Sequence, residues 1–122
     1  MLEGLRSQIY QVTDLEAAKV WYTALLGKPP YFDEPFYVGF NISGYELGLQ
    51  PSEDPDTGQA REAVTYWGVP DAEAAYAHLL ASGASAYQPV QDVGGGIKLG
   101  AVLDPSGNVL GVIENPHFAA EE

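Results

Sequence analysis

An internal repeat of about half the chain length constrains the fold more than any other feature of the sequence. The stretch from Val12 to Gly27, VTDLEAAKVWYTALLG, recurs in altered form from Val69 to Gly83, VPDAEAAYAHLLASG. The identical pairs lie 57 positions apart: Val12/Val69, Asp14/Asp71, Glu16/Glu73, Ala17/Ala74 and Ala18/Ala75. In a chain of 122 residues, this repeat predicts a single domain built from two modules, at about residues 1–57 and 58–122.

Each copy predicts a strand, a capped helix and three further strands. Asp14 and Asp71 are suitable N-caps, and Gly27 followed by Pro29-Pro30 ends the first helix. The expected strands are residues 5–12, 31–33, 36–42, 45–50, 62–69, 84–93, 97–103 and 109–114, with a linker at 51–59. The expected buried residues of the second helix are Ala72, Ala75, Tyr76, Leu79 and Leu80. The glycines at 94–96 predict a hairpin or a mobile lid.

The dipeptide Ser43-Gly44 predicts a two-residue hairpin turn with a defined register. One face then carries the apolar pairs Ile42/Tyr45, Phe40/Leu47 and Val38/Leu49. The other face carries Asn41/Glu46, Gly39/Gly48 and Tyr37/Gln50. Because side chains alternate between the faces of a strand, this division supports the register and leaves one side of the sheet for the helix.

The turn from Asp104 to Asn108, DPSGN, predicts a second hairpin. If Leu103 pairs with Asn108, Gly100 faces Gly111. The inward-facing residues of this hairpin are then Lys98, Val102, Val109 and Ile113. The predicted fold class is α+β: two βαβββ modules form a curved mixed sheet around a shared cavity.

The charge balance excludes several classes of partner. Acidic residues number 17 against 5 basic ones, for a net charge of −12, which disfavours nucleic acid, anionic membranes and polyanionic substrates. The charge is compatible with a cationic ligand or with solubility alone. The chain has no cysteine, so it has no disulfide or thiolate site. The N-terminal MLEGLRSQIY has no long apolar run, and we expect a cytoplasmic protein.

The order and spacing of several short motifs resemble the vicinal oxygen chelate superfamily, which includes glyoxalase I, the bleomycin-resistance proteins and the extradiol dioxygenases. The motifs are Val12-x-Asp14-Leu15-x-Ala17, Trp21-Tyr22, Leu26-Gly27, Val69-x-Asp71, Gly83-Ala84, Asp104-Pro105-Ser106-Gly107-Asn108 and Ile113-Glu114. The resemblance implies the glyoxalase/bleomycin-resistance/dioxygenase fold. It also implies a homodimer, because the bleomycin-resistance branch often shares its pocket across two chains.

The resemblance also indicates where metal ligands would stand. The family positions fall on Ser7, Val64, Gly111 and Gly48, or on Glu46 in place of Gly48 if the register slips. Because these residues replace the usual ligands, we expect no metal and no cofactor. His78 is expected on the surface, His117 in a tail that packs on the domain or on a partner, and Glu114 in a structural role.

The remaining candidates are side chains on the presumed concave face. The predicted ligand-binding residues are Ser7, Gln11, Tyr37, Asn41, Glu46, Gln50, Tyr66 and Lys98. Glu46 is a candidate catalytic base with a raised pKa, or a carboxylate tied to Asn41 or Lys98.

The sequence therefore predicts a metal-independent protein that holds an apolar or cationic small molecule in the cavity between the modules. Two alternatives stay open. One is a divalent-metal lyase or dioxygenase with atypical ligands, so that any enzyme activity would be glyoxalase- or dioxygenase-like. The other is a non-catalytic association module.

Overall fold

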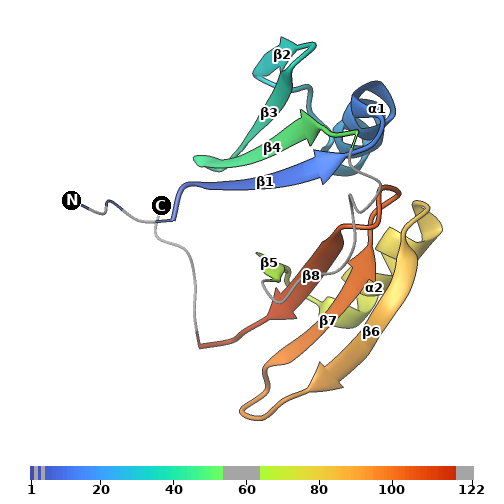
Figure 1. Cartoon of the computed structure of the whole chain (residues 1–122). Helices are drawn as coiled ribbons and strands as arrows, with labels where there is room; N and C mark the ends of the chain where they lie inside the picture. Colours follow the sequence, from blue (N-terminus) through green and yellow to red (C-terminus); the bar gives the residue numbers. More distant parts are fainter. Residues whose placement is uncertain (2, 4, 54–63, 118–122) are drawn as a thin grey trace. The chain divides into compact units, whose positions relative to one another are not determined.

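The computed structural model describes residues 1, 3, 5–53 and 64–117, and the chain divides into two compact units, residues 1–59 and 60–122 (Figure 1). Each unit has the predicted order of one strand, one helix and three strands. The part of the predicted linker beyond Glu53 and the predicted start of a strand at Glu62 lie outside the described residues.

The first unit is a four-stranded mixed sheet with one helix (Figure 1). Its elements are β1 (Ser7–Val12), α1 (Leu15–Leu26), β2 (Phe32–Glu34), β3 (Tyr37–Ile42) and β4 (Tyr45–Pro51). The strand order is β1-β4-β3-β2, and only the β1–β4 pair is parallel. Strand β2 begins one residue later than predicted.

Helix α1 begins and ends where the sequence predicts. The Asp14 side chain accepts a hydrogen bond from the backbone N–H of Ala17 at 3.0 Å, as an N-cap does. Gly27 has a φ of 72°, the left-handed conformation that ends helices and that a glycine adopts without strain.

The register predicted from Ser43-Gly44 is confirmed. Val38 pairs with Leu49 and Phe40 with Leu47, and all four side chains are buried. Helix α1 covers this apolar face and contributes the buried ring of Tyr22.

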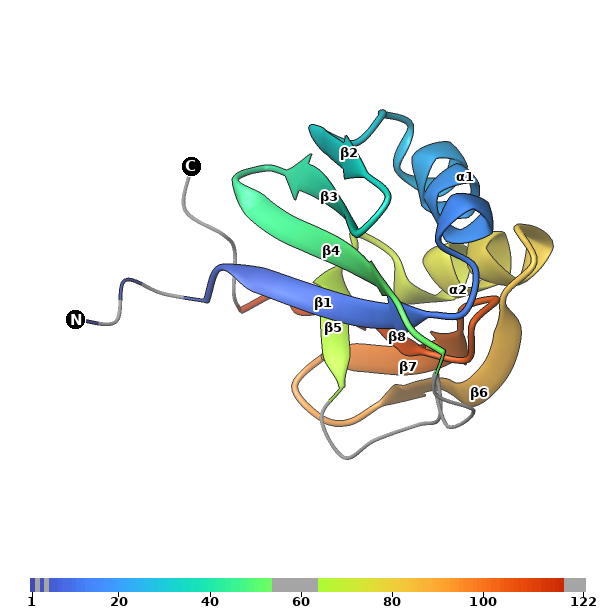
Figure 2. The same cartoon turned by 45° about the horizontal axis from the view of Figure 1, so that its top comes forward.

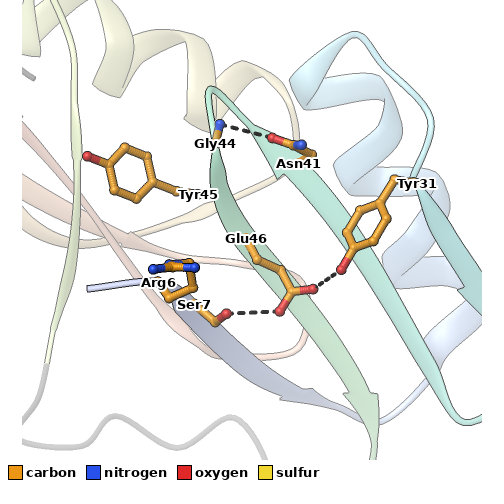
Figure 3. A pocket seen from close by; sticks show the side chains of 7 residues that line it. All are labelled: Arg6, Ser7, Tyr31, Asn41, Gly44, Tyr45 and Glu46. Atoms are coloured by element: carbon orange, nitrogen blue, oxygen red, sulfur yellow. Dashed lines mark hydrogen bonds between the residues drawn. The ribbon is translucent and has the colours of Figure 1, made fainter. Parts of the chain in front are cut away.

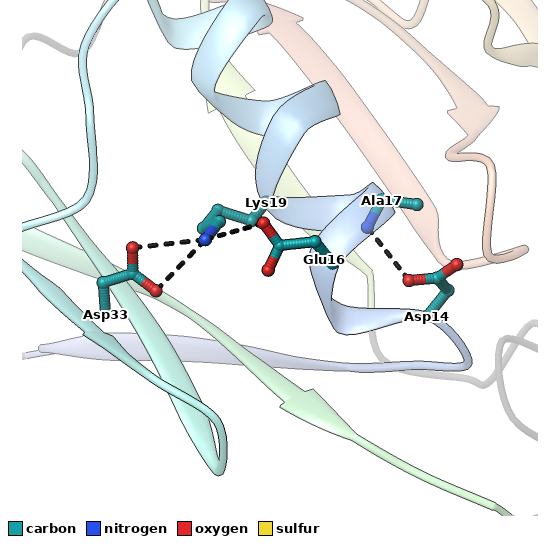
Figure 4. A network of polar contacts seen from close by, with 5 residues as sticks. All are labelled: Asp14, Glu16, Ala17, Lys19 and Asp33. Atoms are coloured by element: carbon teal, nitrogen blue, oxygen red, sulfur yellow. Dashed lines mark hydrogen bonds and ion pairs between the residues drawn. The ribbon is translucent and has the colours of Figure 1, made fainter.

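An ion-pair network lies at the margin of the same face (Figure 4). Lys19 of α1 contacts Glu16 of the same helix at 2.9 Å and Asp33 of β2 at 3.2 Å. Asp33 pairs with Val38, so it points toward the helix side of the sheet. The opposite face of the first sheet is therefore not covered by α1.

The second unit repeats the architecture (Figure 2). Its elements are β5 (Thr65–Gly68), α2 (Ala72–Ala81), β6 (Ser85–Asp92), β7 (Lys98–Leu103) and β8 (Val109–Glu114). The strand order is β5-β8-β7-β6, with β5 parallel to β8. The glycines at 94–96 all have positive φ and connect β6 to β7, so the predicted hairpin is confirmed.

Helix α2 is fixed at its N-terminus by two carboxylates. Asp71 accepts from the backbone N–H of Ala74 at 3.1 Å, and Glu114 of β8 accepts from the N–H of Ala72 at 2.9 Å. The structural interpretation of Glu114 is therefore confirmed. Ala72 and Leu79 are buried, whereas Leu80 is 39% exposed. The expectation that Leu80 is buried is wrong, because successive helical residues point about 100° apart and Leu79 takes the core position.

The register predicted for the second hairpin is wrong by one residue. Leu103 pairs with Val109, and Gly100 faces Val112 in place of Gly111. The backbone N–H of Asp104 donates to the carbonyl of Asn108 at 2.9 Å. The turn therefore closes at Asp104 and Asn108 and not, as predicted, at Leu103 and Asn108, which makes the loop one residue shorter.

A one-residue shift moves one strand's side chains to the other face. Lys98 and Val102 therefore share a face with Leu110, whereas Val109 and Ile113 lie on the opposite face with Gly111. The expectation that Lys98, Val102, Val109 and Ile113 form one inward-facing set is wrong.

Candidate functional site

The face of the first sheet that α1 does not cover is here called the polar face. On it, side chains of the neighbouring strands β1 and β4 lie next to one another. In the parallel register, Ser7 lies beside Glu46, Ile9 beside Gly48 and Gln11 beside Gln50. The nearest neighbour of Ser7 on β4 is thus Glu46. Gln11 and Gln50 join through an amide hydrogen bond of 2.6 Å further along the strands.

Glu46 is the centre of a hydroxyl cluster on this face. Its Oε1 accepts hydrogen bonds from the hydroxyls of Ser7 and Tyr37, each at 2.9 Å. Its Oε2 accepts from the phenol of Tyr31 (Figure 3). Three neutral donors from β1, β3 and the segment before β2 therefore fix the carboxylate in one orientation.

The cluster favours the ionised form of Glu46. The hydrogen bond from Tyr31 lowers the pKa of the carboxyl below its ordinary 4.5, helped by Tyr37 and Ser7 and opposed by burial. The expected raised pKa of Glu46 is wrong, because three donors to the carboxylate outweigh its desolvation. Burial, followed by the bond to Glu46, raises the pKa of Tyr37 to about 12, so its phenol remains a donor at neutral pH.

Two glycines make room for the cluster. A Cβ at Gly48 would lie 2.0 Å from the hydroxyl oxygen of Tyr37, and a Cβ at Gly39 would lie 3.0 Å from Cε1 of Tyr31. The second unit repeats the arrangement, because a Cβ at Gly111 would lie 2.6 Å from the ring of Tyr66. The space expected above Gly48 is therefore occupied by an aromatic ring.

A pocket of about 230 Å³ lies beside Glu46 within the first unit (Figure 3). Its lining residues are Arg6, Ser7, Tyr31, Asn41, Gly44, Tyr45 and Glu46. The Asn41 side chain accepts from the backbone N–H of Gly44 at 2.9 Å and so closes the β3–β4 turn in the pocket wall. Glu46 is the acidic group of this lining and Arg6 the basic one.

The predicted ligand-binding residues divide into three groups. Ser7, Tyr37 and Glu46 are joined directly, and Asn41 lines the same pocket. Gln11 and Gln50 lie on the same face as a separate pair, whereas Tyr66 and Lys98 belong to the second unit. Their roles in binding stay predictions, as do the cavity between the modules and the homodimer.

Sequence reasoning missed Tyr31, Tyr45 and Arg6. Tyr31 precedes β2, and its backbone N–H donates to the carbonyl of Gly39 at 3.0 Å, which brings its ring onto the polar face. The available signal was the bare Gly39: a strand glycine leaves a gap that an aromatic side chain of the neighbouring strand can cover.

The residues present do not fit a divalent metal centre. The family positions carry a hydroxyl at Ser7, an apolar side chain at Val64 and no side chain at Gly111, which leaves the Glu46 carboxylate. Within residues 5–53 and 64–117, no group of three or more His, Cys, Asp or Glu side chains is placed to hold a metal ion.

The fold consists of two βαβββ modules, one in each unit. The family model of the Glyoxalase/Bleomycin resistance protein/Dioxygenase superfamily matches residues 5–112. The chain therefore belongs to this superfamily, and the predicted resemblance and the α+β fold of two βαβββ modules are confirmed. A comparison with curated proteins gives no significant match.

Solved structures share the fold at low identity. A glyoxalase-related enzyme from Fulvimarina pelagi is 21% identical, with a TM-score of 0.77 over 94% of this chain and 90% of that one. A superfamily member from Sphaerobacter thermophilus is 22% identical, with a TM-score of 0.75 over 93% and 98%. A lactoylglutathione lyase from Agrobacterium tumefaciens is 16% identical, with a TM-score of 0.75 over 99% and 100%. At these identities the similarity establishes the fold. In the part of the chain that the structure describes, neither helix has the length and apolar character needed to cross a membrane.

Proposed function

We propose that this chain binds a small organic molecule at the polar face of its first sheet and that it does so without a metal. The observation that supports this most is Glu46, a carboxylate held by three hydroxyls at the edge of a pocket of about 230 Å³. A few fixed polar groups beside aromatic walls are the usual means by which a pocket orients a ligand.

The donor set supports the metal-independent form of the proposal. A typical catalytic zinc site needs three protein ligands, and the lining of the pocket offers one carboxylate, Glu46, among hydroxyls. Tyr37 occupies the space above Gly48, so a side chain that reached a metal from that position would displace the ring. The rival is a metal enzyme in which Glu46 is the β4 ligand, favoured by its place beside Ser7.

The test combines metal analysis with fragment binding on the full chain. We expect the purified protein to hold much less than one equivalent of Zn, Ni, Mn or Fe. We expect fragments that shift the backbone amide signals of Ser7 and residues 41–46 to bind equally before and after chelator treatment. Near-stoichiometric metal, together with loss of fragment binding on chelation, would contradict the proposal and support the metal enzyme.

A second outcome separates the association module from the binder. If no fragment of a diverse library shifts these amide signals, the pocket is not a ligand site. Light scattering would then show whether the chain self-associates, as the predicted homodimer requires. Glu46→Gln that leaves fragment binding intact would remove Glu46 from the proposed site.

A further inference from the structure

We infer that the ligand of the Glu46 pocket is a small organic amine in its ammonium form, which donates one N–H to Oε2 of Glu46 and lies beside the ring of Tyr31. This inference rests on the proposed function and specifies its ligand class. The hydrogen-bond capacity of the carboxylate, its charge and the walls of the pocket support it.

The carboxylate of Glu46 has one acceptor position left. An ionised carboxylate offers about four lone-pair sites, two on each oxygen. Oε1 accepts from both Ser7 and Tyr37, whereas Oε2 accepts from Tyr31. The open site is therefore on Oε2, and one further donor completes the set.

The charge of Glu46 is not neutralised by its partners. All three are hydroxyls, and the ion pairs of the described segments join Arg6 to Glu3 and Lys19 to Glu16 and Asp33. Neutral donors orient a carboxylate but leave its full negative charge in the pocket. A cationic donor at the open site forms a charge-assisted hydrogen bond, about twice as strong as a neutral one.

The walls of the pocket suit an ammonium group attached to a carbon skeleton. Tyr31 is 63% exposed and lines the pocket, and its hydroxyl binds the same oxygen that would accept the ligand's N–H (Figure 3). An ammonium bound to Oε2 is a neighbour of the Tyr31 hydroxyl on the same oxygen, so the carbon skeleton of the ligand can pack against the exposed ring of Tyr31. Phe32 does not line the pocket, but its ring centroid lies 6.4 Å from that of Tyr31 and extends the aromatic surface next to it.

An anionic ligand fits less well. Arg6 lines the pocket, but its guanidinium is 3.6 Å from the carboxylate of Glu3 and its side chain is 64% exposed, so it offers little net attraction. An anion would also meet the unneutralised charge of Glu46. The net charge of −12 raises the local concentration of cations around the chain.

The test compares three probes that share a benzyl or phenyl group and differ in charge: benzylamine, benzyl alcohol and benzoate. Each is titrated into ¹⁵N-labelled protein at neutral pH, and the amide signals of Ser7 and residues 41–46 are followed. We expect benzylamine to bind at least about tenfold more tightly than benzyl alcohol, with benzoate weakest. Raising NaCl from about 0.02 M to about 0.5 M should weaken the amine alone.

Two matched variants assign the effect to one carboxylate. Glu46→Gln keeps the size of the side chain and should reduce benzylamine binding to the level of benzyl alcohol. Glu73→Gln makes the same charge change on the exposed first turn of α2 and should leave binding unchanged. Arg6→Gln removes the positive charge from the pocket lining and should strengthen amine binding, and weaker binding would contradict the inference.

The outcomes separate this inference from the proposed function. If the three probes bind at these amides with equal affinity, the site binds small molecules and the inference of an amine is overturned. If benzoate binds most tightly, the ligand is an anion and the inference is again overturned. If no probe shifts these signals in a wild-type chain with a folded spectrum, the proposed pocket itself is overturned.

Discussion

Replacement of Gly48 by alanine tests whether the ring of Tyr37 fills the space above this glycine on the polar face. The new Cβ would lie 2.0 Å from the hydroxyl oxygen of Tyr37 and 2.6 Å from its Cζ, well inside van der Waals contact. The backbone of β4 is held by β1 and β3 on its two sides, so the ring of Tyr37 moves instead. Its hydrogen bond to Glu46 is then broken.

The sign of the stability change is the decisive quantity. A hydrogen bond to a charged group contributes about 1.5–3 kcal/mol, and Tyr37 is part-buried, so the lower end applies. Against this, alanine in a strand interior gains about 0.5–1 kcal/mol over glycine. We expect Gly48→Ala to destabilise the chain by about 1 kcal/mol, a fall in Tm of about 4 °C for a protein of this size.

The assay is thermal unfolding together with a spectrophotometric titration of the tyrosines. Tyr37, with a pKa of about 12 in the wild type, should ionise closer to its ordinary 10.0 in Gly48→Ala. Gly68→Ala is the matched control, because Gly68 also lies in a strand and its Cβ would meet no atom within 4 Å. The control should be neutral or slightly stabilised.

Equal behaviour of the two variants would contradict the position of the Tyr37 ring over Gly48. If Gly48→Ala is as stable as Gly68→Ala and its tyrosine titration matches the wild type, the ring of Tyr37 does not lie over Gly48. The polar face would then have open space at that position, as the sequence pattern alone suggested.

Other predictions follow from the same contacts. Because the pKa of Glu46 is lowered in the folded state, its carboxylate stabilises the chain above pH 4.5, and this stability is lost as the pH falls through the folded-state pKa. The free energy of urea unfolding of Glu46→Gln should therefore depend less on pH below 4.5 than that of the wild type. The same pH dependence in both proteins would contradict this. Asp104→Ala removes the acceptor of the Asn108 N–H, at 2.8 Å, and should cost about 1–3 kcal/mol of unfolding free energy; a neutral result would count against it. Asp14→Ala and Asp71→Ala should each cost about 1 kcal/mol in the same assay, and unequal losses would show that the caps differ.

The parts of the fold that depend on local chemistry could be predicted from the sequence. The helix caps at Asp14 and Asp71 and the two-residue turn at Ser43-Gly44 each specify backbone geometry within a few residues. The turn also fixed the register of the polar face, so the pairing of Asn41 with Glu46 followed directly.

The second hairpin shows where this reasoning fails. DPSGN is compatible with loops of different length, and the hydrogen bonds of Asp104 to the N–H groups of Ser106 and Asn108 select the shorter one. A side chain that bonds to the backbone of its own turn decides the loop length, and composition does not reveal that choice. A one-residue error there was enough to place Lys98 on the wrong face.

Only the part of the candidate site that lies on paired strands could be predicted from the sequence. Strand alternation placed Tyr37 and Glu46 on one face, because it depends on pairing alone, and the family resemblance placed Ser7 beside them. Tyr31 lies before β2, outside any strand, and its contact with Glu46 depends on how that segment packs over Gly39. The environment of Glu46, and hence the direction of its pKa shift, could not be derived without that contact.

The most direct test of the hydroxyl cluster is a pH titration of the Glu46 side-chain carboxyl by ¹³C NMR on metal-free protein. We expect a pKa below the ordinary 4.5 in the wild type, and a higher value in Tyr31→Phe, which keeps the ring and removes the hydroxyl that lowers the pKa most. A wild-type pKa above 4.5, or one that Tyr31→Phe leaves unchanged, would contradict the claim that hydroxyl donors hold Glu46 as an ionised ligand anchor.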